Sequence, residues 1–92
     1  MEKFRLKILT PKGTVLDKDV TGLYLRGAEG DLAVFAGHIP FVTPVRPGKC
    51  TVVTTDDGSA DGEDDIEGNT SEGTLRVNSK EVLLMVRKWE DT

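Results

Sequence analysis

Apolar and basic residues alternate along the first segment of the chain, residues 4–9. In order, these residues are Phe4, Arg5, Leu6, Lys7, Ile8 and Leu9. A period of two residues predicts a β-strand with one buried face, because successive side chains of a strand point to opposite sides. Pro11 and Gly13 follow, and these residue types favour a tight turn. We therefore expect a strand and a turn at the start of the chain.

Most of the remaining chain consists of short apolar or β-branched segments separated by turn residues. These segments predict strands at residues 14–16, 20–26, 31–35, 41–45, 49–55, 74–77 and 82–86. The polar residues 17–19 predict a break, Gly22 predicts a bulge, and residues 78–80 predict a hairpin turn. No segment has a helical period of useful length. The pattern predicts an all-β fold, a small β-sandwich or flattened barrel of roughly eight to ten short strands.

Residues 56–73 differ in composition from the segments on either side. They are rich in acidic residues and glycine, and Ile66 is the one strongly apolar residue among them. Such a segment buries too little apolar surface to offset the entropy of ordering it. We therefore expect a solvated, mobile acidic loop at 56–73 within one domain that spans residues 1–92, a length that suits a single small core.

Composition and charge exclude several classes of partner. The formal net charge is -4, whereas nucleic-acid affinity depends on clustered lysine and arginine. We therefore expect no nucleic-acid partner. Cys50 is the single cysteine, so no intramolecular disulfide is expected, and we interpret it as a small strand residue. Neither a signal peptide nor an apolar run of about 20 residues is visible in the sequence, so we expect no direct membrane insertion.

Residues 30–43 carry the most distinctive sequence of the chain, GDLAVFAGHIPFVT, and Arg46-Pro47-Gly48 follows shortly after. This run resembles the pattern of the ATP synthase ε subunit, in which Gly-Glu-Leu-Gly precedes Pro-Gly-His-Ala-Pro, an apolar pair and threonine. Residues 6–11 and 20–27 also resemble the opening strands of that family. Asp31 departs from the pattern, because the family commonly has glutamate there.

The resemblance implies a β-sandwich in the central stalk of an F-type ATP synthase, docked on the γ subunit and resting on the ring of c subunits. It implies a non-catalytic role that helps couple proton flow to ATP synthesis, without a cofactor of its own. It also implies a place in the F1 sector, on the cytoplasmic side of a bacterial inner or plasma membrane.

By the same resemblance, five residues are candidates for subunit contacts. Thr10 and Thr43 would lie toward γ, whereas Glu29, Asp31 and His38 would lie toward γ or the c ring. The apolar pair Phe41-Val42 and the Ile39-Pro40 corner are candidate anchors. An interface between two such proteins usually covers roughly 800 Å² on each partner.

Other chemistry has weaker support in the sequence. His38 is the only histidine, and general acid–base catalysis needs a second reacting group within contact range. Residues 57–62 imitate the start of a calcium loop, but its twelfth position is Gly68 instead of glutamate. The alternative function is a free-standing acidic β-sandwich that binds calcium or a small ligand. Trp89 is interpreted as a lid over one opening of the sandwich.

Longer members of the family continue beyond the sandwich into a helical hairpin that restrains ATP hydrolysis. Here residues 87–92 follow the last expected strand, whereas an isolated helix usually needs about 12 to 15 residues to persist in water. The resemblance therefore implies a sandwich without the inhibitory arm.

Overall fold

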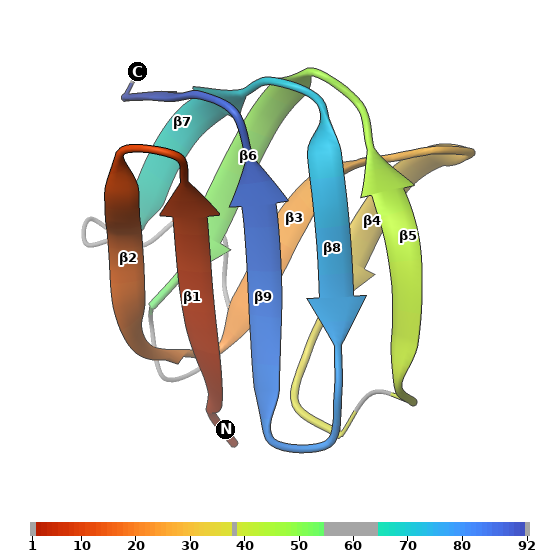
Figure 1. Ribbon diagram of the computed structural model, residues 1–92. Coiled ribbons are helices and arrows are strands. Elements are labelled where there is room, and N and C mark those ends of the chain that lie inside the picture. The colour runs from red at the N-terminus through yellow and green to blue at the C-terminus, as the bar shows by residue number, and fades with distance from the viewer. Residues whose placement is uncertain (1, 38, 55–64, 92) are drawn as a thin grey trace.

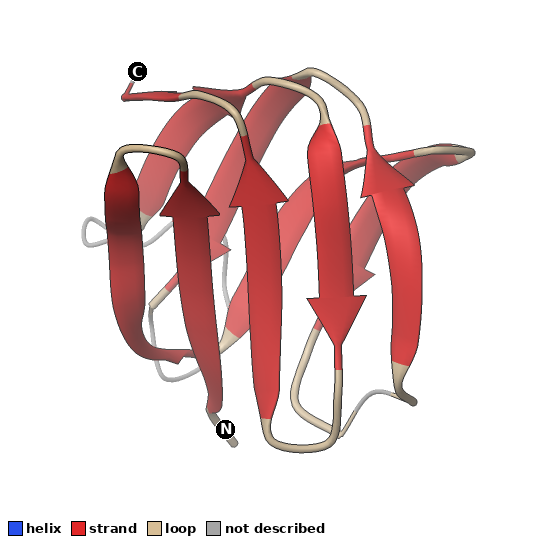
Figure 2. Ribbon diagram, in the orientation of Figure 1, coloured by secondary structure: helices blue, strands red, loops and turns tan. Residues whose placement is uncertain are grey.

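The computed structural model describes residues 2–37, 39–54 and 65–91. In this part of the chain there are ten strands. They are β1 (Phe4–Thr10), β2 (Gly13–Val20), β3 (Gly22–Gly27), β4 (Gly30–Val34), β5 (Phe41–Val45), β6 (Gly48–Val53), β7 (Ile66–Thr70), β8 (Gly73–Val77), β9 (Glu81–Val86) and β10 (Trp89–Asp91). The described residues form no helix that could cross a membrane. The predicted all-β fold is confirmed (Figure 2).

The strands form two layers that face each other (Figure 1). The front sheet has the order β2-β1-β9-β8-β5, and the back sheet has the order β10-β7-β6-β3-β4. One residue pair, Gly27 with Val45, joins β3 to β5 and makes the two sheets continuous. The pairing of β1 with β9 is parallel, and that of the neighbouring β8–β9 hairpin is antiparallel. The sandwich is therefore closed along the side where β3 of the back sheet pairs with β5 of the front sheet.

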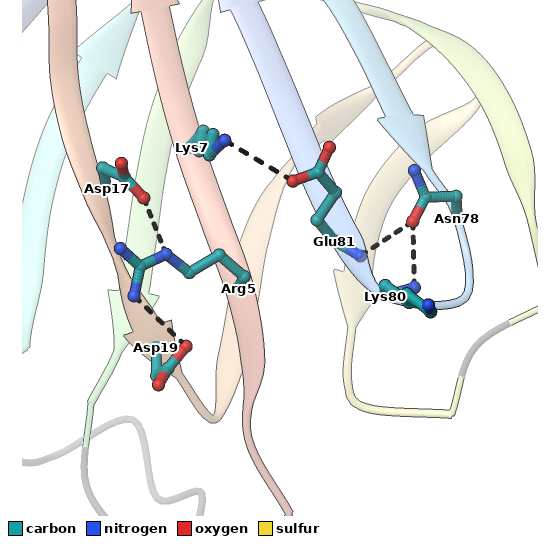
Figure 3. Close-up of polar contacts among 7 residues, drawn as sticks. All are labelled: Arg5, Lys7, Asp17, Asp19, Asn78, Lys80 and Glu81. Atoms are coloured by element: carbon teal, nitrogen blue, oxygen red, sulfur yellow. Dashed lines mark hydrogen bonds and ion pairs between the residues drawn. The ribbon is translucent and has the colours of Figure 1, made fainter.

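The core lies between the layers and consists of the alternate, inward-facing side chains. Leu6 and Ile8 of β1 and Leu75 and Leu84 of the β8–β9 hairpin are fully buried. Burying one such side chain contributes about 1.5–3 kcal/mol. The Asn78 carboxamide oxygen accepts hydrogen bonds from the backbone N–H groups of Lys80 (2.9 Å) and Glu81 (2.7 Å) (Figure 3). The predicted hairpin turn is confirmed.

Two details of the first strands differ from the prediction. Residues 17–19 do not interrupt a strand, because β2 runs without a break from Gly13 to Val20 along the edge of the front sheet. An edge strand leaves charged side chains in water, so polar residues do not end it. The irregularity in register lies between Ile8 and Leu9 of β1. Gly22 is not at a bulge; it pairs with Val53, and a Cβ there would lie 3.1 Å from the ring of Phe35.

The expectation of a loop throughout residues 56–73 is wrong for its second part. Ile66–Thr70 forms β7, which lies between β6 and β10. Gly68 is buried, and a Cβ there would overlap the indole of Trp89, so the tryptophan supplies the apolar surface that β7 lacks. Trp89 packs against the core, as its interpretation as a lid requires. Residues 55–64 lie outside the described part of the chain.

Candidate functional site

The outer face of the front sheet has one half in which charges are paired. We call this the paired half; it consists of Arg5, Lys7, Asp17, Asp19 and Glu81. Arg5 Nε lies 2.7 Å from Asp17 Oδ1, and Arg5 Nη1 lies 3.5 Å from Asp19 Oδ1 (Figure 3). Lys7 Nζ lies 3.6 Å from Glu81 Oε2. The hydrogen bond that Arg5 donates to Asp17 raises the pKa of Arg5, so this arginine stays charged. Both cations of the paired half are neutralised within the chain.

The other half of this face is mainly apolar. We call it the apolar half; its side chains are Leu9, Val42, Pro44, Thr74, Arg76, Leu83 and Met85. Strand register places Leu9, Met85, Thr74 and Pro44 in one row across the sheet, and Leu83, Arg76 and Val42 in the next. Neighbouring strands lie about 4.8 Å apart, so each row is a continuous surface. Val42 is 65% exposed and Met85 is 38% exposed.

A groove of about 760 Å³ lies where the apolar half meets the end of the sandwich. We call it the end groove; residues 9–11, 44–47, 72–74 and 85–87 line it. β8 and β9 approach each other closely here, so that a Cβ on Gly73 would overlap the carbonyl oxygen of Met85. Along one wall, Arg87 Nη1 lies 3.5 Å from Glu72 Oε1. The end groove extends the exposed apolar surface past the edge of the sheet.

A second hollow, of about 410 Å³, lies between the β3–β4 turn and β5. Residues 27–32, Phe41, Thr43 and Pro44 line it. Gly30 has φ near +136° and makes the tight turn that holds Glu29 and Asp31 outward. The side chain of Asp31 is 91% exposed, and its Oδ1 lies 4.0 Å from Arg26 Nε. These carboxylates are available to a partner because they are hardly engaged within the chain.

Four of the predicted contact residues border the two hollows, which meet at Pro44. Thr10 lines the end groove and accepts a hydrogen bond from the Lys12 N–H at 3.2 Å. Glu29, Asp31 and Thr43 line the second hollow. His38 lies outside the described residues. The structure thus brings together residues from three separate parts of the sequence, although their contacts with other subunits stay predictions.

The predicted apolar anchors have different surroundings. Phe41 is partly buried and packs against the core, so it supports β5 from within. Val42 and Ile39, which is 81% exposed, project from the surface. Sequence reasoning missed Leu83 and Met85. The signal was the unbroken apolar run of residues 82–86, because a strand that is apolar on both faces needs cover on both.

The described residues supply little for catalysis or metal binding. Residues 2–37, 39–54 and 65–91 contain no group of three or more histidine, cysteine or acidic side chains that could hold a metal. Burial raises the pKa of Cys50 to about 12, so its thiol is protonated and a poor nucleophile. Of the calcium-loop positions, Glu67 lies in β7 and pairs with Lys49 at 3.5 Å. Residues 57–62 lie outside the described part.

Comparison with solved structures identifies the same fold in larger assemblies. The described architecture is similar to a chain in the cryo-EM structure of the Euglena gracilis mitochondrial ATP synthase, OSCP/F1/c-ring, with a TM-score of 0.83 and 22% identity. The match covers 97% of this chain and 53% of that chain. At this identity the likeness shows the fold alone.

Comparison of sequences identifies the family. The sodium-ion-specific ATP synthase epsilon chain of Acetobacterium woodii is 32% identical over 84 residues, which cover 91% of this chain and 59% of that relative. The ATP synthase epsilon chain of Caulobacter vibrioides is 37% identical over 68 residues, or 74% of this chain and 76% of that relative. The family model for the β-sandwich domain of the ATP synthase delta/epsilon chain matches residues 3–92. The chain therefore belongs to the family of ATP synthase delta/epsilon β-sandwich domains.

Proposed function

We propose that this chain is a non-catalytic rotor subunit of an F-type ATP synthase, which contacts γ and the c ring and couples proton translocation to ATP synthesis. The observation that carries the proposal is the exposed apolar half of the front sheet in a chain of this family. An exposed apolar surface bordered by polar residues is typical of a protein–protein interface. This chain would belong to the F1 sector of the complex, on the cytoplasmic side of the membrane.

The two hollows suit two different partners. The apolar half and the end groove, with Thr10 at the border of the groove, suit docking on γ, because buried apolar area supplies most of the free energy of a stable association. Thr43 lines the second hollow, next to Pro44 where the two hollows meet, and is assigned to γ by the family resemblance. The turn that carries Glu29 and Asp31 suits polar loops of the c ring. Charged contacts of this kind set orientation more than affinity. His38 is assigned to the same contact region by the family resemblance.

The fold also suits the transmission of torque. The two sheets are continuous through the pairing of Gly27 with Val45, which lies next to both hollows. A force applied at the acidic turn would therefore reach β5 through a direct backbone pairing rather than through flexible side chains. The chain would transmit position and force while other subunits of the complex carry out catalysis.

Binding to the γ subunit of the same organism, measured by calorimetry, tests this proposal. We expect the protein to bind γ and to hydrolyse no ATP by itself. Val42→Asp should weaken binding by about 100-fold, because docking would bury a carboxylate in an apolar interface. Asn69→Asp is the matched control: Asn69 is exposed on β7 of the back sheet, away from the apolar half, and adding the same carboxylate there should leave binding unchanged. No binding of the unmodified chain at micromolar concentrations would overturn the proposed function.

A further inference from the structure

Arg76 occupies an unusual position on the outer face of the front sheet. It lies on β8, directly between Leu83 of β9 and Val42 of β5. Its side chain is exposed, and it forms no ion pair with the carboxylates of residues 2–37, 39–54 and 65–91. Arg5, on the same face, contacts two carboxylates. Among the described residues, one arginine of this face is therefore neutralised and another lies between apolar neighbours without a counter-charge.

The border of the apolar half is also positive. Arg46 lines the end groove, and no described carboxylate pairs with its side chain. Arg87 lies at another wall, where Glu72 is its partner at 3.5 Å. The apolar half and its groove thus hold three arginines against one glutamate, whereas the whole chain has a formal net charge of -4. The net charge of this surface is therefore positive, whereas the net charge of the whole protein is negative.

A partner that covers the apolar half must also cover Arg76. Removing a guanidinium from water without a counter-charge is strongly unfavourable, whereas a carboxylate can accept two parallel hydrogen bonds from it. The planar fork of arginine suits this geometry better than lysine does. A phosphate polymer fits less well, because Arg76 is flanked by Leu83 and Val42 rather than by further cations.

We propose that Arg76, assisted by Arg46, selects a protein partner that presents an apolar ridge with an aspartate or glutamate opposite Arg76. This inference rests on the proposed function, in which the partner is γ. Arg76 sets the register of docking, and the surrounding apolar side chains supply contact area. The paired half remains in water, because its charges already have partners.

The test compares two arginines on the same face of the sheet. Binding of γ by calorimetry would be measured for the unmodified chain, Arg76→Glu, Arg76→Gln and Arg5→Gln, at about 50 mM and about 500 mM NaCl. We expect Arg76→Glu to weaken binding by at least about 30-fold and Arg76→Gln by less. Arg5→Gln should stay within about twofold of the unmodified chain. Binding of the unmodified chain should weaken with salt, and that of Arg76→Gln should weaken less.

The outcomes separate this inference from the proposed function. If the unmodified chain binds γ and Arg76→Glu binds as tightly as Arg5→Gln, the role of Arg76 is overturned while the proposed function stands. If the unmodified chain does not bind γ, both are overturned. Self-association that Arg76→Glu abolishes, seen by sedimentation without γ, would assign this face to a second copy of the chain and overturn the inference. Circular dichroism melts would verify that each variant is folded.

Discussion

The paired half and the apolar half of the front sheet have similar inner faces and different outer faces. Inside, Leu6 of β1 and Leu75 of β8 are both fully buried in one core. Outside, Arg5 and Lys7 have carboxylate partners within the chain, whereas Arg76 has none among the described residues. Both halves are exposed, so we infer that the unneutralised charge within the apolar surface, more than exposure itself, marks the contact with a partner.

The two halves also differ in what they present to other strands. β2 is the free edge of the front sheet, and its exposed residues Asp17, Lys18 and Asp19 oppose pairing with another chain. β5, at the other side of the sheet, exposes Val42 and Pro44 instead. One side of the sheet is thus protected against association, and the other side has the composition of an interface core.

The largest expected effect tests whether both halves depend on one core. Leu6→Ala and Leu75→Ala each remove a side chain with 0% exposure, one beneath each half. Each should lower the free energy of unfolding by about 2–5 kcal/mol, because the cavity adds to the lost transfer energy. Urea unfolding at equilibrium measures both. A cost below about 1 kcal/mol for one of them would show that its half is not held by the shared core.

A smaller effect on stability is expected for two glycines, one near the end of each half. Gly73→Ala, in the end groove, would place a methyl group against the carbonyl of Met85, and the backbone must shift to admit it. We expect a loss of about 2–3 kcal/mol, at the upper part of the range for overpacking. Gly13→Ala, in the β1–β2 turn, meets nothing within 4 Å but has φ near +130°. It should cost about 1 kcal/mol through backbone strain alone.

Thermal melts of the two glycine variants would check this order. About 1 kcal/mol corresponds to a shift of roughly 4–8 °C in a domain of this size. Equal shifts would show that the strands at the end groove can separate without difficulty. The close packing of β8 on β9 would then not be what shapes the groove.

Where the sequence alternates clearly, it predicted the fold correctly. β1 and β8 have apolar residues at every second position, so their local pattern agrees with their final environment. β9 is apolar throughout residues 82–86, and the turn residues before it mark the hairpin. β7 could not be predicted in this way. Its inward positions include Gly68, which has no side chain to bury. The apolar cover comes from Trp89, which is distant in the sequence and reaches Gly68 because β10 pairs with β7.

The candidate site shows the same limit. The turn that carries Glu29 and Asp31 is local, so its glycine and acidic residues were visible in the sequence. The apolar half is assembled from β1, β5, β8 and β9, and its composition depends on their register. No local pattern states that Arg76 lies between Leu83 and Val42, or that Arg5 lies opposite Asp17 and Asp19. Charge pairing across strands was therefore beyond sequence reasoning.

The smallest expected effect concerns the ion pairs of the paired half. Arg5→Gln removes the contacts with Asp17 and Asp19, which are exposed to water. Because such pairs are weakened by solvent and by salt, we expect a lower melting temperature at low salt, by less than either glycine variant, and little change at high salt. The hydrogen bond that Arg5 donates to Asp17 raises the pKa of Arg5 above an already high value. The contribution of the arginine is therefore fully present at neutral pH, and deprotonation of the guanidinium would remove it only in strong alkali.

The control for Arg5→Gln is Lys18→Gln. Lys18 is also an exposed cation, on β2, and it forms no ion pair within the described residues. Its replacement changes the net charge equally, so the difference between the two variants isolates the effect of pairing. If both variants melt at the same temperature in low salt, the ion pairs contribute nothing measurable to stability. The contrast between the halves would then rest on Arg76 and the exposed apolar side chains alone, because the contacts of Arg5 would have no measurable effect on stability.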